Sequence, residues 1–433
     1  MAPQKNVESR LLQSNLERRI GMNTLWWKWM CPIPMSPQTS TRLGVVLRLT
    51  LLALVSFGYV MLTSTSSFNP YRGDAFYFAK RQAMWLGLGL AACAAAAFVD
   101  YRRWRRCAWP LCIAAAISLI AVLALGKRVN GALRWLVFGP IRFQPSELAK
   151  FALVIVLAYW LEKVQHAPKG QRRPRIQHWW WGVWGPLTIT GGLAGLIAIE
   201  PDMGTAVLLG AVALLLMWVA GSSSRWLAGI VGTAGTGVVA FLVAIFKYDM
   251  FQGSYFAQRV LHWWRGDDLQ GINYQQFIAM VAFGSGGPWG LGLGNSRQKV
   301  ALLPEAHTDF ILPIIGEELG VMASLGVLVA FCVLVVCGIR RLTRVPDLFG
   351  LLLGSGILAV IGIQALINIA VVTNSIPNKG MPLPFISYGG SNLVMTLGAL
   401  GVLLNIFQQA DAPTEGALKA SWNEPAPQGG DFS

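Results

Sequence analysis

The sequence predicts an all-helical, polytopic membrane protein, and its composition, its long apolar runs and its tryptophan content each support that fold class. Hydrophobic residues make up 54% of the 433 residues and charged residues only 13%, whereas soluble domains carry about a quarter charged residues. A soluble core could not bury this much apolar surface, so the bilayer must be the solvent. The 18 tryptophans suit the two membrane interfaces.

Apolar runs recur along the chain, and each has about 17 residues or more, enough to cross about 30 Å of hydrocarbon. They predict about ten spans at residues 43–64, 83–99, 107–126, 146–162, 183–199, 203–220, 226–246, 309–338, 350–373 and 390–409. Glu200-Pro201-Asp202 alone separates the fifth run from the sixth, which predicts a tight helical hairpin. The eighth run is long enough to tilt or to extend beyond the bilayer.

These runs divide the chain into three parts. Residues 1–42 are polar and basic without a cleavable signal peptide, residues 43–409 form the membrane domain, and residues 410–433 are polar and predicted to be disordered. The large loop 247–308 lies between the seventh and eighth spans. Apolar side chains within its residues 256–264 recur at helical spacing, which predicts an amphipathic helix lying on the membrane surface.

The basic residues indicate orientation rather than nucleic-acid binding. Short basic loops at 101–106, 169–175 and 340–344 fall on one side, which the positive-inside rule makes cytoplasmic, with both termini on that side. The net charge of +15 is spread over the loops, so anionic lipid head groups are the expected partners and nucleic acid is not. The six cysteines form no C-x-x-C motif and are expected to be small buried hydrophobes.

Other basic residues fall on the outer side, where orientation alone does not require them. They are Lys127, Arg128, Arg134, Arg142, Arg259, Arg265, Arg297 and Lys299. They are either snorkelling interfacial residues or a binding surface for an anionic, phosphate-bearing substrate, and composition leaves both readings open. The glycine-rich stretch 284–294 is not a phosphate-loop motif. It allows either a flexible connection or the close approach of a ligand.

Polar side chains within predicted spans are costly and are usually paired or functional. Glu147 and Lys150 share one helix face, either as a structural ion pair or as the lining of an outward cavity. Gln364 and Asn368 are expected to form hydrogen bonds between helices. Asp202 suits a helix N-cap.

The stretch from Leu303 to Phe310 is the most informative for chemistry. Asp309 falls where a helix begins at the outer surface, so it is either an N-cap or a general base that takes a proton from a sugar hydroxyl. His307 belongs to no metal-ligand array, so zinc is not expected. The two prolines in the stretch 378–391 forbid a regular helix, which indicates the wall of a wet cavity.

Several motifs together resemble one family, the SEDS (shape, elongation, division and sporulation) polymerases of the bacterial cell wall, over residues 43–409. The match is closest to the cell-division branch, and an elongation role stays open. The motifs that carry it are Gly131 to Trp135, Gln144 to Lys150, Glu200 to Ala206, Gly292 to Lys299, Leu303 to Phe310, Gly316 to Gly320 and Lys379 to Ser391.

The resemblance implies a peptidoglycan glycosyltransferase in the cytoplasmic (inner) membrane. Such enzymes polymerise lipid II, a disaccharide-pentapeptide on undecaprenyl diphosphate, on the outer face of the membrane. They work with a class B penicillin-binding protein, the crosslinking transpeptidase, and with other proteins of the divisome. The resemblance leaves open whether a divalent cation, Mg or Mn, assists the departing diphosphate. The sequence shows no metal-binding motif.

The resemblance also assigns roles to residues. Asp309 matches the essential acidic residue and would deprotonate the acceptor hydroxyl. The expected substrate-binding residues are Arg134, Trp135, Glu147, Lys150, Lys299, His307, Lys379 and Ser387. Three of them, Arg134, Lys150 and Lys379, would offset the charge of the leaving diphosphate. This chain departs from the usual motifs at Asn374, Asn378 and Asn392.

Two other functions compete with polymerisation. A transporter that flips the lipid-linked precursor would also place polar residues inside a helical bundle. A non-catalytic scaffold that recruits the transpeptidase would need no reactive carboxylate. The crowding of polar residues at the outer mouth favours chemistry at the membrane surface over alternating access.

Overall fold

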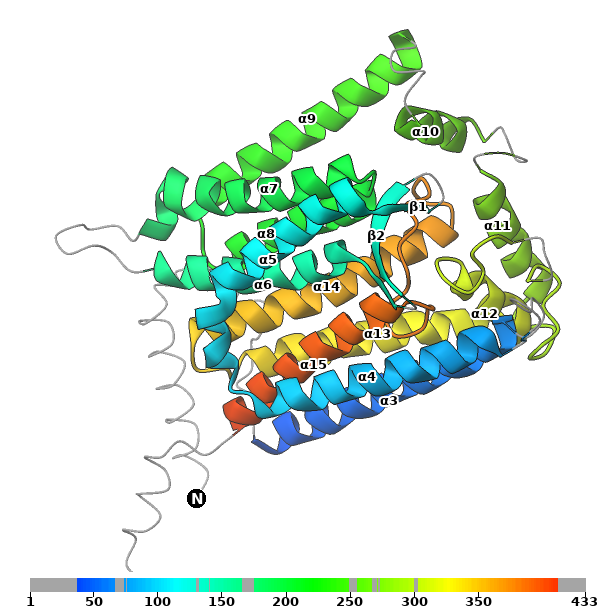
Figure 1. The fold of residues 1–433 in the computed structure, drawn as a ribbon, viewed down its shortest axis with the longest axis horizontal. Helices are drawn as coiled ribbons and strands as arrows, with labels where there is room; N and C mark the ends of the chain where they lie inside the picture. Colours follow the sequence, from blue (N-terminus) through cyan, green and yellow to red (C-terminus); the bar gives the residue numbers. More distant parts are fainter. Residues whose placement is uncertain are drawn as a thin grey trace, which may run out of the picture.

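The computed structural model of the chain is built almost entirely of helices (Figure 1). It describes residues 37–66, 74, 76–129, 132–139, 141–165, 175–248, 255–266, 271, 273–299 and 303–411. Most of the two predicted tails lies outside the described residues. Of the predicted tail 1–42 the structure describes only the first residues of α3. Of the predicted tail 410–433 it describes only the last residues of α15.

The helices and strands follow the chain in this order: α3 (Pro37–Ser66), α4 (Tyr77–Phe98), η1 (Tyr101–Arg103), α5 (Trp104–Leu125), β1 (Lys127–Val129), β2 (Ala132–Phe138), β3 (Ile141–Phe143), α6 (Pro145–Lys163), η2 (Arg175–Gln177), η3 (Trp180–Trp184), α7 (Gly185–Ile199), α8 (Met203–Val219), α9 (Ser224–Tyr248), α10 (Tyr255–Arg265), α11 (Tyr274–Gly286), α12 (Ile311–Leu319), α13 (Val321–Leu342), α14 (Leu348–Val372) and α15 (Gly390–Asp411).

The apolar runs account for the helical bundle. Each predicted span except 309–338 lies on one continuous helical segment. Seven helical segments of the described chain are long and apolar enough to cross a membrane, with α8 as a shorter apolar helix. The chain is therefore a multi-pass membrane protein. The predicted loop 247–308 also contains helices, α10 and α11, and α10 covers the predicted amphipathic segment.

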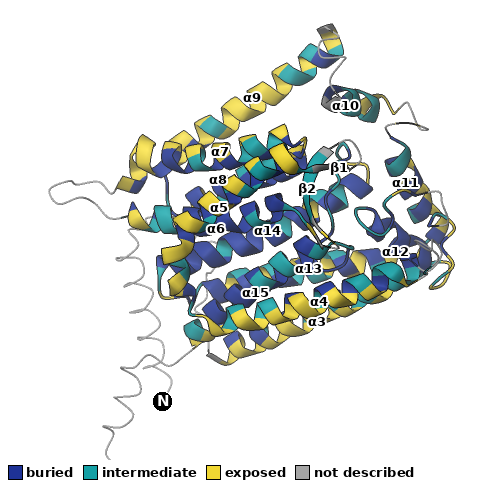
Figure 2. Cartoon of the chain, viewed as in Figure 1, coloured by how far each residue is buried: buried dark blue, intermediate teal, exposed yellow. Residues whose placement is uncertain are grey.

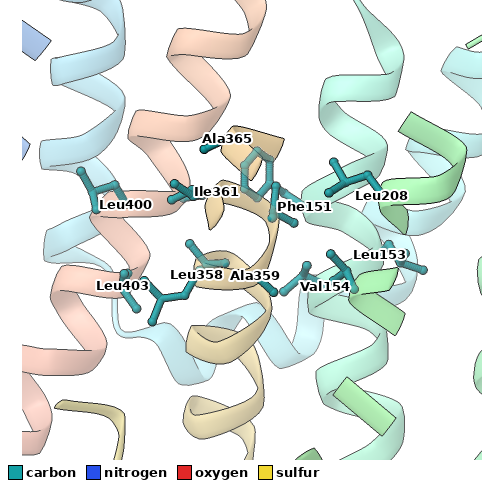
Figure 3. Close-up of a cluster of buried hydrophobic side chains, with 14 of the residues drawn as sticks. Phe151, Leu153, Val154, Leu208, Leu358, Ala359, Ile361, Ala365, Leu400 and Leu403 are labelled. Carbon is teal, nitrogen blue, oxygen red and sulfur yellow. The ribbon is translucent and has the colours of Figure 1, made fainter. Parts of the chain in front are cut away.

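Helix α14 lies at the centre of the bundle, where it packs against α6, α8, α13 and α15. Figure 3 shows its Leu358 and Ile361 between Val154 of α6 and Leu403 of α15. Most of α14 is buried, whereas α3, α4 and α9 carry many exposed residues on their outer faces (Figure 2). Large apolar residues such as Leu49, Leu88 and Val238 are among them. This distribution is the one expected when lipid, rather than water, surrounds the bundle.

The predicted span 309–338 is two helices, because the chain breaks between α12 and α13 at Gly320. Gly320 has a φ of +86°, and a Cβ atom there would lie 2.1 Å from the carbonyl oxygen of Pro288. The glycine-rich loop crosses the break and pairs with it: the Leu291 and Gly292 amides donate to the carbonyls of Glu317 and Glu318. The close approach that these glycines permit is thus to backbone of the same chain.

A small antiparallel sheet in the connection between α5 and α6 was not predicted. Its strands run in the order β1-β2-β3, with Arg128 opposite Leu133 and Leu136 opposite Phe143. Strands of three to seven residues leave too little periodicity to separate them from a loop. We call the end of the bundle that holds this sheet, the turn between α7 and α8, and the loops 303–310 and 373–389 the site end (Figure 1).

Candidate active site

Asp309 is the last residue but one before α12, and helix α14 fixes its backbone. The side-chain amide of Asn368 donates to the carbonyl of Asp309 at 2.8 Å and to the carbonyl of Met381 at 2.7 Å. One buried amide therefore joins the loop 303–310 to the loop 373–389. A Cβ atom on Gly380 would lie 3.2 Å from Asp309 Oδ2, so the second loop lies against the carboxyl group.

The surroundings of Asp309 raise the pKa of its carboxyl group to about 7, first through burial and then through the negative charge of Glu305. This pKa of about 7 also includes a lowering effect of the Arg134 charge and a smaller raising effect of the Asp202 charge. A carboxylate that binds a proton near neutral pH is a much stronger base than an ordinary aspartate. This is the property that a general base needs, and the alternative role of simple N-cap is not seen, because Phe310 precedes α12 and makes no side-chain cap.

Strand β2 supplies Arg134 and its neighbour Trp135, and both are half-buried. The Arg134 guanidinium donates to the backbone carbonyls of Glu200, at 3.4 Å, and of Pro201. The unpredicted sheet thus holds a cation over the turn between α7 and α8, close enough to Asp309 to lower the pKa of its carboxyl group.

Asp202 begins α8 as its N-cap, and Oδ1 and Oδ2 accept from the amide and hydroxyl of Thr205. Sequence reasoning assigned it this structural role and omitted it from the site. The structure agrees on the cap and adds that Asp202 acts electrostatically on Asp309. Gly204 lies against Met381 and the carbonyl of Lys379, so α8 begins directly beside the loop 373–389.

Glu147 and Lys150 form a buried ion pair at the start of α6, with 2.8 Å between Lys150 Nζ and Glu147 Oε2. The same ammonium group donates to Gln364 Oε1 at 2.7 Å, and Gln364 donates in turn to the carbonyl of Pro382 at 2.9 Å. The pair is therefore linked through α14 to the wall of the site. Both readings of the sequence, structural pair and cavity lining, agree with this arrangement.

Lys379 lies half-buried on the same loop as Gly380. Burial, and then the positive charge of Arg259 on α10, lower the pKa of its ammonium group to about 8. Arg259 also donates to the carbonyl of Asn378 at 3.1 Å, and Trp263 donates to the carbonyl of Asn374 at 3.0 Å. The amphipathic helix thus holds this loop in place and adds positive charge to it.

His307 and Ser387 shape the two loops. The carbonyl of His307 accepts from the amide of Tyr388 at 2.9 Å, and its ring lies 4.3 Å from the ring of Phe78 on α4. Burial lowers the pKa of His307, so its imidazole is neutral near pH 7. The hydroxyl of Ser387 accepts from the amide of Leu383 at 2.8 Å and closes a turn.

Lys299 belongs to a different cluster from the other predicted residues. Its fully buried ammonium group pairs with Glu318 at 2.5 Å and contacts Ser64 of α3. The adjacent Glu317 accepts from Ser285, Ser296 and the amide of Arg297. These groups hold the glycine-rich loop against the end of α12, and the structure does not bring Lys299 to Asp309.

The described residues contain no group of three or more histidine, cysteine, aspartate or glutamate side chains placed to hold a metal ion. The candidate site centres on the carboxyl group of Asp309, and three cations lie on elements that act on it or are linked to the loop beside it. They are Arg134 on β2, Lys150 on α6 and Lys379 on the loop before α15. Such a set suits an anionic substrate that gives up a proton.

A family model described as a cell cycle protein of the FtsW/RodA/SpoVE type matches residues 45–412. The chain belongs to this family. A relative from Geobacter metallireducens, described as a probable peptidoglycan glycosyltransferase FtsW, is 38% identical over 373 residues, which are 84% of this chain and 94% of the relative.

Two solved structures share the family fold. A chain from a structure described as the coordination of polymerization and crosslinking by a peptidoglycan synthase complex is 28% identical, with a TM-score of 0.69 over 84% of this chain and 97% of that one. The rod shape determining protein RodA of Thermus thermophilus is 28% identical, with a TM-score of 0.59 over 84% and 96% of the two chains.

Proposed function

We propose that this chain is a peptidoglycan glycosyltransferase that polymerises lipid II, with Asp309 as its general base. Its membership of the family and its likeness to a named glycosyltransferase support the activity. The observation that carries the catalytic role is the half-buried Asp309 carboxyl group, whose pKa of about 7 suits proton transfer at neutral pH.

The reaction forms one glycosidic bond and breaks one bond to phosphate. The 4-hydroxyl oxygen of the acceptor sugar attacks the anomeric carbon of the donor, and Asp309 takes the hydroxyl proton. The bond between that carbon and the diphosphate oxygen breaks, and the undecaprenyl diphosphate leaves with the electron pair. Because only the ionised carboxyl can accept the proton, the rate should rise as pH rises through about 7.

The cations of the site would stabilise the leaving group. Negative charge grows on the diphosphate as the bond breaks, and fixed positive groups in a site shielded from water lower the energy of that state. Arg134 acts electrostatically on Asp309, Lys379 precedes Gly380 in the loop against Asp309, and Lys150 is linked to that loop through Gln364. We assign them to the diphosphate, and we assign Trp135, His307 and Ser387 to the shape of the sugar site.

The site end would face outward from the cytoplasmic membrane, with both termini in the cytoplasm. The basic loops support this orientation, because 101–106 and 340–344 lie at the opposite end of the bundle from the site end (Figure 1). We expect a class B penicillin-binding protein as partner, as in the solved synthase complex that combines polymerization with crosslinking. The relatives named FtsW support a role in septal wall synthesis with other division proteins.

A divalent cation such as Mg or Mn would arrive with the diphosphate rather than in a protein cage. The described residues offer no carboxylate cluster to hold it. When bound, it would neutralise charge on the departing phosphates, and the residues named above do not depend on it for their assigned roles.

Purified protein with its transpeptidase and labelled lipid II tests the function. The wild type should form glycan polymer, and Asp309→Asn should lower the rate by about 10²–10⁴-fold, the usual effect of losing a general base. The shared fold should persist, because the backbone carbonyl that Asn368 binds is unchanged. Thermal unfolding of both proteins in detergent is the control.

Each competing outcome identifies another function. Polymer made equally fast by Asp309→Asn would remove the general base. Movement of lipid II across vesicle membranes without polymer would indicate a flippase. Transpeptidase recruitment by a chain that makes no polymer under any condition would indicate a scaffold.

A further inference from the structure

Glu200, at the end of α7, is a buried acid that the proposed mechanism does not use. Its exposed fraction is 0%, and among the described residues neither carboxyl oxygen has a hydrogen-bond partner. Buried polar groups in proteins are nearly always paired. A carboxyl group left in this state beside an active site therefore needs a physical explanation.

The charged groups that face Glu200 come from two elements. Arg134 on β2 and Asp202 at the start of α8 both act electrostatically on it. The backbone of Lys379 lies against α8 at Gly204. Asp202 and Arg134 also act electrostatically on Asp309. Glu200 and Asp309 are thus both within electrostatic range of the same guanidinium group.

Burial of an ionised carboxylate without a partner costs several kcal/mol, and the group takes up a proton instead. Burial, followed by the charge of Asp202, raises the pKa of Glu200 to about 8, although Arg134 opposes the shift. The carboxyl group is therefore neutral at pH 7. Arg134 meanwhile donates to two backbone carbonyls, those of Glu200 and Pro201, which orient the guanidinium without cancelling its charge.

We infer that Glu200 is a positioning residue for Arg134: as a neutral acid it leaves the guanidinium charge directed toward the substrate diphosphate, and as a carboxylate it draws that charge away. This inference rests on the proposed glycosyl transfer. It assigns to Glu200 no contact with the substrate, because both of its oxygens are shielded.

The sign of the pH effect follows from the active form. Glu200 must hold its proton, so its contribution is complete below pH 8 and is lost as pH rises through about 8. Lys379 loses its charge near the same pH, which would also weaken the diphosphate site. The two effects can be separated with Lys379→Arg, because a guanidinium group stays protonated throughout this range.

The test compares K379R with the double variant E200Q/K379R, each with its transpeptidase and labelled lipid II at pH 7 and pH 9. For K379R, ionisation of Glu200 should lower the rate about tenfold between these pH values, as one group with a pKa of about 8 requires. For the double variant this loss should disappear. Its rate at pH 9 divided by its rate at pH 7 should therefore be about tenfold higher than the same ratio for K379R.

Equal pH ratios in the two proteins would overturn the inference, even if E200Q also lowered the melting temperature, since a purely structural residue would not change the profile. Where K379R is too slow to measure, the wild type and E200Q serve instead. Above pH 8 the logarithm of the wild-type rate should then fall with pH at the slope expected for loss of two protons, and that of E200Q at the slope for one proton. Equal slopes would again overturn the inference. Absence of polymer from the wild type at pH 7 would refute both this inference and the proposed function.

Discussion

At the scale of single residues, the site is defined by which charges are compensated. The Lys150 ammonium group is paired with Glu147 and hydrogen-bonded to Gln364, so its charge is held in a fixed position. Asp309 and Glu200 are only partly compensated, and the pKa of each carboxyl group rises toward neutrality. Perturbed groups of this kind gather at functional sites because catalysis needs them near the working pH.

Lys150→Met tests the buried pair. It would leave the Glu147 carboxylate without its cation, and loss of one partner of a buried pair typically costs about 3–5 kcal/mol of unfolding free energy. Thermal unfolding in detergent, followed by tryptophan fluorescence, should show a clear fall in the melting temperature. Lys163→Met on the exposed last turn of α6 is the matched control and should change it little.

The double variant E147Q/K150M separates the two roles of the pair. It removes both charges together, so it should recover much of the stability lost by Lys150→Met. A stable double variant that makes no polymer would assign the pair to the site. A stable double variant with full activity would assign it to structure alone.

At the scale of elements, α14 and the break between α12 and α13 place the reacting groups. Asn368 and Gln364, one turn apart on α14, bind the backbone at Asp309, Met381 and Pro382. The break at Gly320 keeps α12 short, so Asp309 is held at the head of a separate short helix. The buried Lys299–Glu318 pair fixes the other end of α12.

Gly320→Ala tests the break. The left-handed φ of +86° strains any side chain by about 1–3 kcal/mol, and the added Cβ would also collide with the Pro288 carbonyl. We expect a lower melting temperature and a loss of polymerisation, because Asp309 depends on α12. Gly326→Ala on α13 is the matched control: a Cβ there meets nothing within 4 Å, and the helix should be unchanged or stabilised by up to about 1 kcal/mol. Equal stability of the two variants would contradict the role of the break.

At the scale of the whole molecule, the bundle has two chemically different ends. The site end gathers Asp309, Arg134 and Lys379. At the opposite end, Arg105 bridges Glu162 and Asp347, and Arg341 pairs with Asp411. Arginine-rich loops at one end and a substrate site at the other give the molecule a direction across the membrane.

Cysteine labelling tests that direction. With the native cysteines replaced, Trp289→Cys reports on the site end, where Trp289 is 82% exposed, and Arg103→Cys reports on the basic end, where Arg103 is exposed. A membrane-impermeant maleimide should label the first in intact spheroplasts and the second only after permeabilisation. The reverse pattern would place the site end in the cytoplasm and contradict the proposed reaction.

Most helices could be predicted from the sequence, because each apolar run by itself shows that its side chains must be buried in lipid. The resemblance likewise placed Asp309, Arg134 and Lys379 in one candidate site. The sheet β1–β3 was missed since its strands are short, and the break at Gly320 was missed since the apolar pattern continues across it. Only backbone geometry, through the contact with Pro288, interrupts the helix there.

The sequence by itself determined the spans and the types of side chain at the site, because hydrophobicity and motifs are properties of neighbouring residues. Tertiary structure alone decided which charges meet. It brought Arg134 within electrostatic range of both Glu200 and Asp309, and it paired Lys299 with Glu318 instead. Pairing of this kind depends on distances between groups far apart in the chain and on the water excluded around them, and neither is encoded locally.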